Sequence, residues 1–325
     1  MDRLGRSTVA LRVCAAAALL TGCGGGSQLG SNQMQPNASQ TRMSLALIDR
    51  GAGAHAAPGR SWIAPEAKKS DLVYISNFYN STVLVSTYSG GKYVGSISSD
   101  DPQGECTSKT SNGNWWVVAS GADEVMEYAH GGTSPISTLS ENVGEPAGCA
   151  IDPTTGNLAV SILGMGDLVI FADAKGSGTT LPDGLRWTDF PCYDNHGDLF
   201  VTGLTTASNS ALVELPKGGS SFETITLDPN EQGDMQWHDD YLAVGGSGGI
   251  YHFAIHGTKG KEIGFTPLDG SSDIVQLWIQ GRYVVGADAG NENAEMWKYP
   301  AGGPVFRYLH GSFDLPIGAT VSVAK

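Results

Sequence analysis

The sequence predicts an all-β fold, a six-bladed β-propeller with four antiparallel strands in each blade. Three observations support it: a high glycine content, a repeat of about 43 residues, and two ends of the repeating region that complement each other. The 325 residues include 45 glycines, and 40 % of all residues are hydrophobic. Glycine at about twice its average frequency indicates many tight turns, and the hydrophobic fraction is too high for a disordered chain.

Three cysteines mark the repeat. Cys106, Cys149 and Cys192 follow one another at intervals of 43 residues. At intervals of 41 to 43 residues the same register continues to Met235, Gln276 and Ala319. A period of about 40 to 50 residues is typical of a propeller blade, so the 255 residues from Asp71 onward hold about six blades.

Each unit contains four short runs of alternating apolar character, separated by turns rich in Gly, Asn, Asp and Pro. In residues 124–128, for example, Val125 and Glu127 fall on one face of a strand, and Met126 and Tyr128 fall on the other. Alternation with a period of two predicts strands and not helices.

The two ends of the repeating region complement each other. Residues 71–75 match the second strand of a unit, and residues 318–323 match the first strand. We therefore expect the C-terminal strand to pair with the N-terminal blade. That pairing would close the ring and remove an open sheet edge.

The N-terminus has the composition of an export signal. Arg3, Arg6 and Arg12 precede the short apolar run 13–20, which is too brief to span a bilayer. The sequence Leu-Thr-Gly-Cys that ends at Cys23 resembles the lipobox of bacterial lipoproteins. This resemblance implies that Cys23 becomes a lipid-bearing N-terminus. The alternative is an ordinary signal peptide followed by a chance cysteine.

These features divide the chain into three parts: a lipoprotein signal peptide at 1–22, a flexible tether at 23–60, and the propeller at 61–325. The tether is rich in Gly, Ser, Asn and Gln and cannot bury enough apolar surface to fold. We expect an exported protein that is lipid-anchored in the bacterial cell envelope. Because no aspartate follows Cys23, the resemblance implies the outer membrane in a Gram-negative organism.

The central repeats carry a further resemblance. The segments Gly148–Asp152 and Gly156–Val160 resemble the NHL repeat, and the whole region is similar to NHL-like and gluconolactonase (regucalcin)-like six-bladed propellers. Those families include both lactonases and noncatalytic binding scaffolds, so the resemblance does not choose an activity.

Net charge limits the possible partners. The chain has 19 Lys and Arg residues against 33 Asp and Glu residues, which gives a formal net charge of −14. An acidic surface repels phosphates, so we expect no nucleic-acid partner. A cationic or neutral ligand remains compatible with this charge.

Loops that lead into the first strands of the blades surround one mouth of the central channel, and we predict a ligand site there. Its candidate residues are polar or acidic, together with one tryptophan that could stack on a sugar or a peptide side chain. They are Gln103, Glu105, Glu145, Asp189, Asp234, Asp273 and Trp187.

The gluconolactonase resemblance also implies a divalent cation held by carboxylate and amide oxygens, which suit Ca²⁺. Glu145, Asp189 and Asp234 are the metal-ligand candidates, although the motifs of that family are not present in order. The alternative is that these are solvated loop carboxylates.

The cysteines and most tryptophans are expected to be structural. Sixfold geometry would separate equivalent cysteines of adjacent blades by roughly 7 to 10 Å, beyond the reach of a disulfide. We therefore expect Cys106, Cys149 and Cys192 to be buried apolar residues, with a strained bridge or a redox pair as the alternative. Blade packing is expected for the tryptophans at strand positions, which are Trp115, Trp116, Trp237 and Trp278.

Taken together, these features favour a membrane-anchored, noncatalytic propeller scaffold that binds a protein or a small ligand on the channel face. No combination of nucleophile, base and orienting group can be assembled, and this absence argues against catalysis. The sequence alone does not decide whether the protein is an enzyme. The alternative is a metal-dependent lactonase or hydrolase that uses the channel-face carboxylates. A purely structural envelope protein, with no concave site, is the third possibility.

Overall fold

The computed structural model describes residues 59–108, 113–140 and 143–325, and all of them belong to one structural unit. The predicted signal peptide, Cys23 and most of the predicted tether lie outside the described residues. Nearly all regular structure in the described part is β-strand. Its helices are short 3₁₀ segments, namely η2 (Pro65–Lys69), η3 (Phe78–Asn80) and η4 (Ala172–Ala174). No helix among the described residues is long and apolar enough to cross a membrane.

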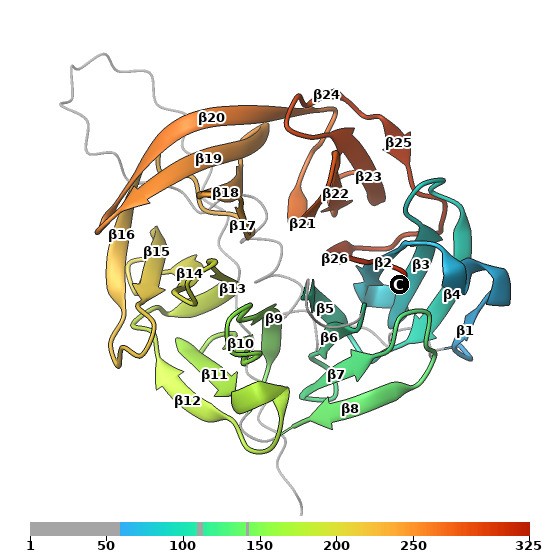
Figure 1. Ribbon diagram of the computed structural model, residues 1–325, viewed down its shortest axis with the longest axis horizontal. Coiled ribbons are helices and arrows are strands. Elements are labelled where there is room, and N and C mark those ends of the chain that lie inside the picture. Colours follow the sequence, from blue (N-terminus) through green and yellow to red (C-terminus); the bar gives the residue numbers. More distant parts are fainter. Residues whose placement is uncertain (1–58, 109–112, 141–142) are drawn as a thin grey trace, which may run out of the picture. The chain divides into compact units, whose positions relative to one another are not determined.

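Hydrogen bonding groups the described strands into five sheets that surround a common centre (Figure 1). Three of the sheets have the predicted four strands. The first is β5 (Pro102–Thr107), β6 (Trp115–Ala119), β7 (Glu124–Tyr128) and β8 (Pro135–Leu139). The second is β9 (Pro146–Ile151), β10 (Leu158–Ile162), β11 (Asp167–Phe171) and β12 (Thr179–Pro182). The third is β21 (Ile274–Gln280), β22 (Tyr283–Asp288), β23 (Asn293–Lys298) and β25 (Arg307–Tyr308).

A fourth sheet has nine strands because two antiparallel groups of four are joined at their outer edges. One group is β13 (Trp187–Tyr193), β14 (Leu199–Leu204), β15 (Ser210–Leu215) and β16 (Glu223–Asp228). The other is β17 (Met235–His238), β18 (Tyr241–Gly246), β19 (Gly249–His256) and β20 (Lys259–Asp269). Strand β16 pairs in parallel with β20, and the short β24 (Gly303–Pro304) pairs with the far end of β20. Six separate sheets were expected, and this joining reduces the number to five.

The fifth sheet unites the two ends of the described chain. It contains β1 (Trp62–Ile63), β2 (Leu72–Asn77), β3 (Thr82–Thr87), β4 (Tyr93–Ser98) and β26 (Pro316–Ser322). Strand β26 pairs antiparallel with β2, so that Val321 lies opposite Val73 and Ala319 lies opposite Ile75. The predicted pairing of the C-terminal strand with the N-terminal part of the sheet is therefore confirmed.

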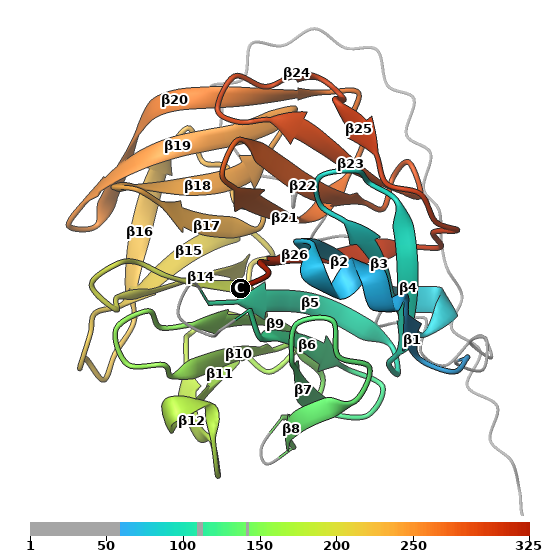
Figure 2. The same cartoon turned by 45° about the vertical axis from the view of Figure 1, so that its right-hand side comes forward.

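The innermost strands form a closed cycle. Strand β26 contacts β5, and the contacts continue through β9, β13, β17 and β21 back to β26. Figure 2 shows β26 in place between β5 and β21. We refer to these as the inner strands, and the space that they surround is the central channel.

The apolar core lies between neighbouring sheets. Strand β7 illustrates the predicted alternation, because Val125 packs in a cluster with residues of β9 to β11, whereas Tyr128 packs in a cluster with residues of β2 to β4. Trp115 is fully buried and stacks between Tyr74, at 3.9 Å between ring centroids, and Tyr128, at 5.0 Å. The packing role predicted for Trp115 and Trp116 is confirmed, since both are buried.

One expectation about the cysteines is wrong. Cys106 on β5 and Cys149 on β9 form a disulfide with their Cα atoms 5.7 Å apart. The inner strands come closer than sixfold geometry predicts because glycines face each other there. A Cβ on Gly104 would lie 2.6 Å from the carbonyl oxygen of Ala147 and 2.8 Å from the Cα of Gly148. Cys192 is free and buried, as expected.

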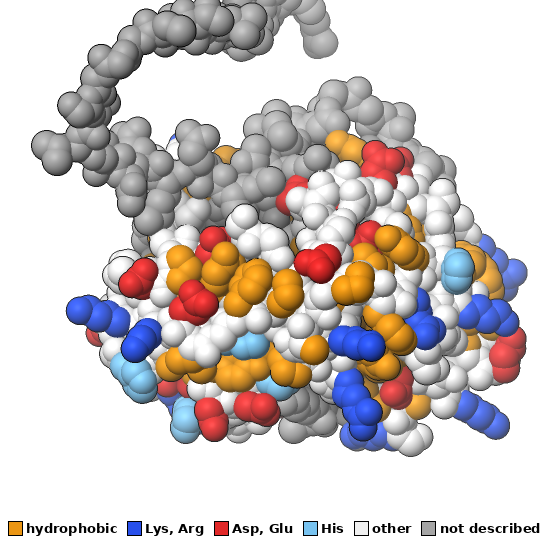
Figure 3. Space-filling view, turned by 90° about the horizontal axis from the view of Figure 1, so that it is seen from above, with side chains coloured by type: hydrophobic (Ala, Val, Ile, Leu, Met, Phe, Trp, Pro, Cys, Tyr) orange, Lys and Arg blue, Asp and Glu red, His pale blue; other side chains and the backbone are white. Residues whose placement is uncertain are grey.

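The outer rim carries most of the exposed apolar side chains. Ile263 and Phe265 on β20 and Tyr308 on β25 are exposed, as is Phe306 just before β25. Figure 3 faces the side of the rim on which β20 and β24 lie, and shows hydrophobic side chains in bands that are interrupted by acidic and basic groups. The rim is therefore mixed in character.

Candidate binding cavity in the channel

A cavity of about 120 Å³ lies in the channel, among the second halves of five inner strands. Strands β5, β9, β13, β17 and β21 all contribute to its wall, and the Cys106–Cys149 disulfide forms part of it. The remaining inner strand, β26, is hydrogen-bonded to Gln276, which also lines the cavity. Its Oε1 accepts a hydrogen bond from the backbone N–H of Ala319, at 2.9 Å.

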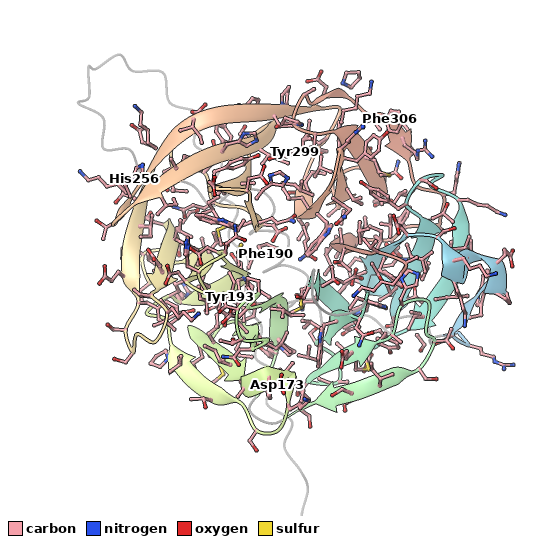
Figure 4. All side chains as sticks on the ribbon, in the orientation of Figure 1. Asp173, Phe190, Tyr193, His256, Tyr299 and Phe306 are labelled. Carbon is pink, nitrogen blue, oxygen red and sulfur yellow. A yellow bond between two sulfur atoms is a disulfide. The ribbon has the colours of Figure 1, made fainter. Side chains whose placement is uncertain are left out.

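Three aromatic side chains line the cavity: Tyr193 from β13, Trp237 from β17 and Trp278 from β21. The indole of Trp237 stacks on Phe200 with ring centroids 5.8 Å apart and donates its Nε1–H to the carbonyl oxygen of Asp239 at 3.0 Å. The Nε1–H of Trp278 has no hydrogen-bond partner. Figure 4 shows Tyr193 near the centre of the ring.

Glu105 is one of two carboxylic acids in the cavity wall, and its side chain is completely buried. The hydroxyl of Ser76 donates to its Oε1 at 2.8 Å, whereas its Oε2 has no hydrogen-bond partner. Burial raises the pKa of Glu105 well above its usual value, and the hydrogen bonds from Ser76 and the backbone of Thr320 oppose that shift.

Asp234 is the second acid. The backbone N–H of Leu277, on the neighbouring inner strand, donates to its Oδ2 at 2.9 Å. Burial raises the pKa of Asp234 to about 8, although the N–H groups of Leu277 and Met235 act in the opposite direction. Both acids occupy the same position of the repeat, one residue before Cys106 and one residue before Met235.

The electrostatic character of the cavity follows from its composition. Among the described residues that line it, none is Lys, Arg or His, and two are buried acids. Neither acid takes part in an ion pair within the described part of the chain. The cavity therefore combines aromatic residues with two carboxylic acids that have no basic residue beside them in the described lining.

The opposite end of the channel, where the inner strands begin, is closed by apolar side chains. Ala147, Phe190, Val275 and Ile317 come from four different inner strands and pack with Phe78 in one buried cluster. Figure 4 shows Phe190 beside the centre of the ring. We predicted a ligand site at this end, but the cavity lies toward the other end of the inner strands.

The predicted site residues are accordingly separated. Glu105 and Asp234 line the cavity. Gln103, Asp189 and Asp273 are buried but lie outside it, and the amide of Gln103 donates to the hydroxyl of Ser120 at 2.9 Å. The Gln103 amide thereby links β5 to the residue that follows β6.

Glu145 and Trp187 also lie outside the cavity. The side chain of Glu145 is exposed, and its backbone N–H donates to Oδ1 of Asp123 at 2.9 Å. Trp187 is half-buried against the apolar cluster that closes the channel. The guanidinium of Arg186 lies 5.9 Å from the centroid of the Trp187 ring.

The metal-ligand candidates Glu145, Asp189 and Asp234 do not form a cation site together. The described residues contain no group of three or more His, Cys, Asp or Glu side chains arranged to hold a metal ion. Two cavity residues, Trp237 and Trp278, were assigned to packing from the sequence. Both stand two residues after the repeat position of Cys106, and this is the signal that could have placed them beside the channel.

Comparisons with known proteins bear on the fold. No protein family matches the sequence, and no curated protein matches it. A chain in a crystal structure of a nidogen/laminin complex superposes with a TM-score of 0.64 at 10 % identity, over 79 % of this chain and 100 % of that one. The fold is a β-propeller.

A second solved structure agrees. A protein of unknown function from Bacteroides caccae has a TM-score of 0.59 at 13 % identity and covers 78 % of this chain and 99 % of its own length. The β-propeller resembles the NHL-like kind that the repeats predicted. At these identities the likeness concerns the fold alone.

Proposed function

We propose that this protein is a noncatalytic binding propeller that holds a small ligand in the channel cavity. The observation that carries the proposal is the cavity itself, which is lined by three aromatic residues and two carboxylic acids and has no Lys, Arg or His among its described lining residues. Small-molecule sites are typically concave, mostly apolar and aromatic, with a few polar groups that fix the ligand, and this cavity has that composition.

A six-bladed ring is the architecture that we infer for this scaffold. The closed cycle of contacts runs through β26, β5, β9, β13, β17 and β21, and each of these begins a run of antiparallel strands. On this reading the nine-stranded sheet is two blades joined by the parallel pairing of β16 with β20. The joining is an outer-edge feature and leaves the channel unchanged.

The same proposal places the protein at a membrane. The lipobox-like sequence ending at Cys23 would attach it by lipid to the envelope of a bacterial cell. The Cys106–Cys149 disulfide supports export, because disulfides persist in oxidising compartments and are rare in the cytosol. Metabolic labelling with an alkyne fatty acid tests the anchor. The wild type should be labelled and Cys23→Ser should not, whereas equal labelling would contradict it.

A matched pair of tryptophan substitutions tests ligand binding in the cavity. A library of small metabolites is screened for compounds that raise the melting temperature of the wild type, which binding does by mass action. Each active compound is then titrated into Trp278→Ala and into Trp62→Ala, whose side chain is exposed on the outer strand β1. We expect at least a tenfold loss of affinity in Trp278→Ala and none in Trp62→Ala. Equal affinities in the two variants, or no active compound, would contradict the proposal.

A further inference from the structure

We propose that the channel cavity selects a small organic cation, an alkylammonium group that lies against the indole and phenol faces and beside the two buried acids. This inference rests on the proposed function and adds the chemical class of the ligand. Two features of the cavity lead to it: its aromatic wall, and its two acids without a basic residue in the described lining.

The aromatic wall provides a surface that attracts cations. The face of an indole or phenol ring carries negative electrostatic potential, and Trp attracts cations more strongly than Tyr or Phe does. Tyr193, Trp237 and Trp278 come from three successive inner strands and line one cavity. Aromatic walls of this kind are used in proteins to hold alkylated ammonium groups.

The two buried acids have no positively charged neighbour in the described cavity wall. Glu105 and Asp234 lie in a cavity whose described wall contains no Lys, Arg or His. Placing an anion in such a site is costly, and this is why burial raises the pKa of both side chains. A cation in the cavity would supply the missing charge and allow the acids to ionise. An anionic ligand would meet no attractive charge there.

A metal ion is not the expected ligand of this cavity, because the described residues hold no group of three metal-binding side chains. An organic cation needs no such group, since aromatic rings and nearby carboxyl groups are enough to attract it.

Choline and 3,3-dimethyl-1-butanol form a matched pair of probes, because they share size and shape and differ in charge. Isothermal titration of the full chain should show choline binding at least ten times more tightly than the neutral alcohol. Asp234→Asn and Glu105→Gln should each weaken choline binding by at least tenfold. Glu145→Gln, which removes an exposed acid outside the cavity, should leave it unchanged.

The wild type alone provides a second readout if a substitution prevents folding. Binding of a cation favours the ionised acids, so protons are released and affinity should rise with pH between 6 and 8. The other titratable side chains that line the cavity are Glu105, Tyr193 and Cys192, and burial keeps Tyr193 and Cys192 protonated in this range by raising the pKa of each. Titration in buffers of different ionisation enthalpy measures the released protons.

The outcomes separate this inference from the proposed function. Equal affinity for the two probes, or choline affinity that does not change with pH, would overturn the cation inference. The same holds if choline does not bind while other compounds bind in a Trp278-dependent manner, and in these cases the binding propeller stands. Absence of any ligand for the cavity would overturn both.

Discussion

Gln276 and Glu105 are joined by two hydrogen bonds although 171 residues separate them in the sequence. The backbone N–H of Glu105 donates to Oε1 of Gln276, and Nε2 of Gln276 donates to the backbone oxygen of Glu105, both at 2.9 Å. The same Oε1 accepts from the N–H of Ala319 on β26. One amide side chain thus links β21, β26 and β5, which is the place where the chain closes on itself.

Gln276→Ala should destabilise the protein by about 3 kcal/mol, because three backbone groups lose their partners and each unsatisfied buried group costs about 1–3 kcal/mol. Urea unfolding measures the change. Gln236→Ala is the matched control, since Gln236 makes two similar hydrogen bonds with Ile279 and should cost less. Unchanged stability of Gln276→Ala would contradict the role of this residue in closure.

The disulfide should stabilise the ring. Cys106 and Cys149 enclose a 43-residue loop, and a cross-link of this length is expected to contribute about 4 kcal/mol by restricting the unfolded chain. The double variant Cys106→Ala/Cys149→Ala should therefore melt at a lower temperature than the wild type. A reducing agent should lower the melting temperature of the wild type and leave the double variant unchanged. A wild type insensitive to reduction would show that the bridge is not formed.

Close approach of the inner strands depends on glycine. A Cβ on Gly318 would lie 2.0 Å from the backbone oxygen of Gln103, on the neighbouring inner strand. Gly318→Ala should therefore destabilise the protein by about 2 kcal/mol through overpacking. Gly144→Ala provides the comparison, because a Cβ there meets nothing within 4 Å. Thermal unfolding should separate the two variants, and similar melting temperatures would argue against tight contact at Gly318.

Stability should fall as pH rises toward 8. Asp234 is protonated in the folded protein up to about pH 8, whereas in the unfolded chain it ionises near pH 4. Between these values the folded state binds one more proton, so each pH unit removes about 1.4 kcal/mol of stability through this group. Glu105 and Glu295 act in the same direction, since the pKa of each is raised by burial.

Asp234→Asn tests the assignment of that effect. The amide does not titrate, so the variant should gain stability relative to the wild type as pH increases from 5 to 8. Urea unfolding at several pH values gives the two slopes. Parallel slopes would show that Asp234 is ionised in the folded protein throughout this range.

Most of the architecture could be predicted from local patterns. The repeat of the cysteines, the alternation in segments such as 124–128, and the matching ends at β2 and β26 depend on neighbours in the sequence or on a regular period. Outer-edge pairing could not be predicted in this way. The parallel contact between β16 and β20 joins segments of different repeats and leaves no periodic signal.

The site was harder to predict because it depends on how closely the inner strands approach. Gly104 and Gly148 bring β5 and β9 together, which permits the disulfide that ideal sixfold spacing excludes. Phe190 and its neighbours fill the end of the channel where the polar residues were expected to gather. Glu105 and Asp234 were recognised as site candidates. Trp237 and Trp278 were assigned to packing and do pack against the apolar core, but a strand position alone does not show that they also line a cavity.

A crystal structure of the protein soaked with choline tests the central claim most directly. We predict ligand density in the cavity lined by Trp237 and Trp278, with the ammonium group on the side of Glu105 and Asp234. Ligand density beside Glu145 or Trp187 at the other end of the channel, or a cavity that contains only water at saturating choline, would contradict the account.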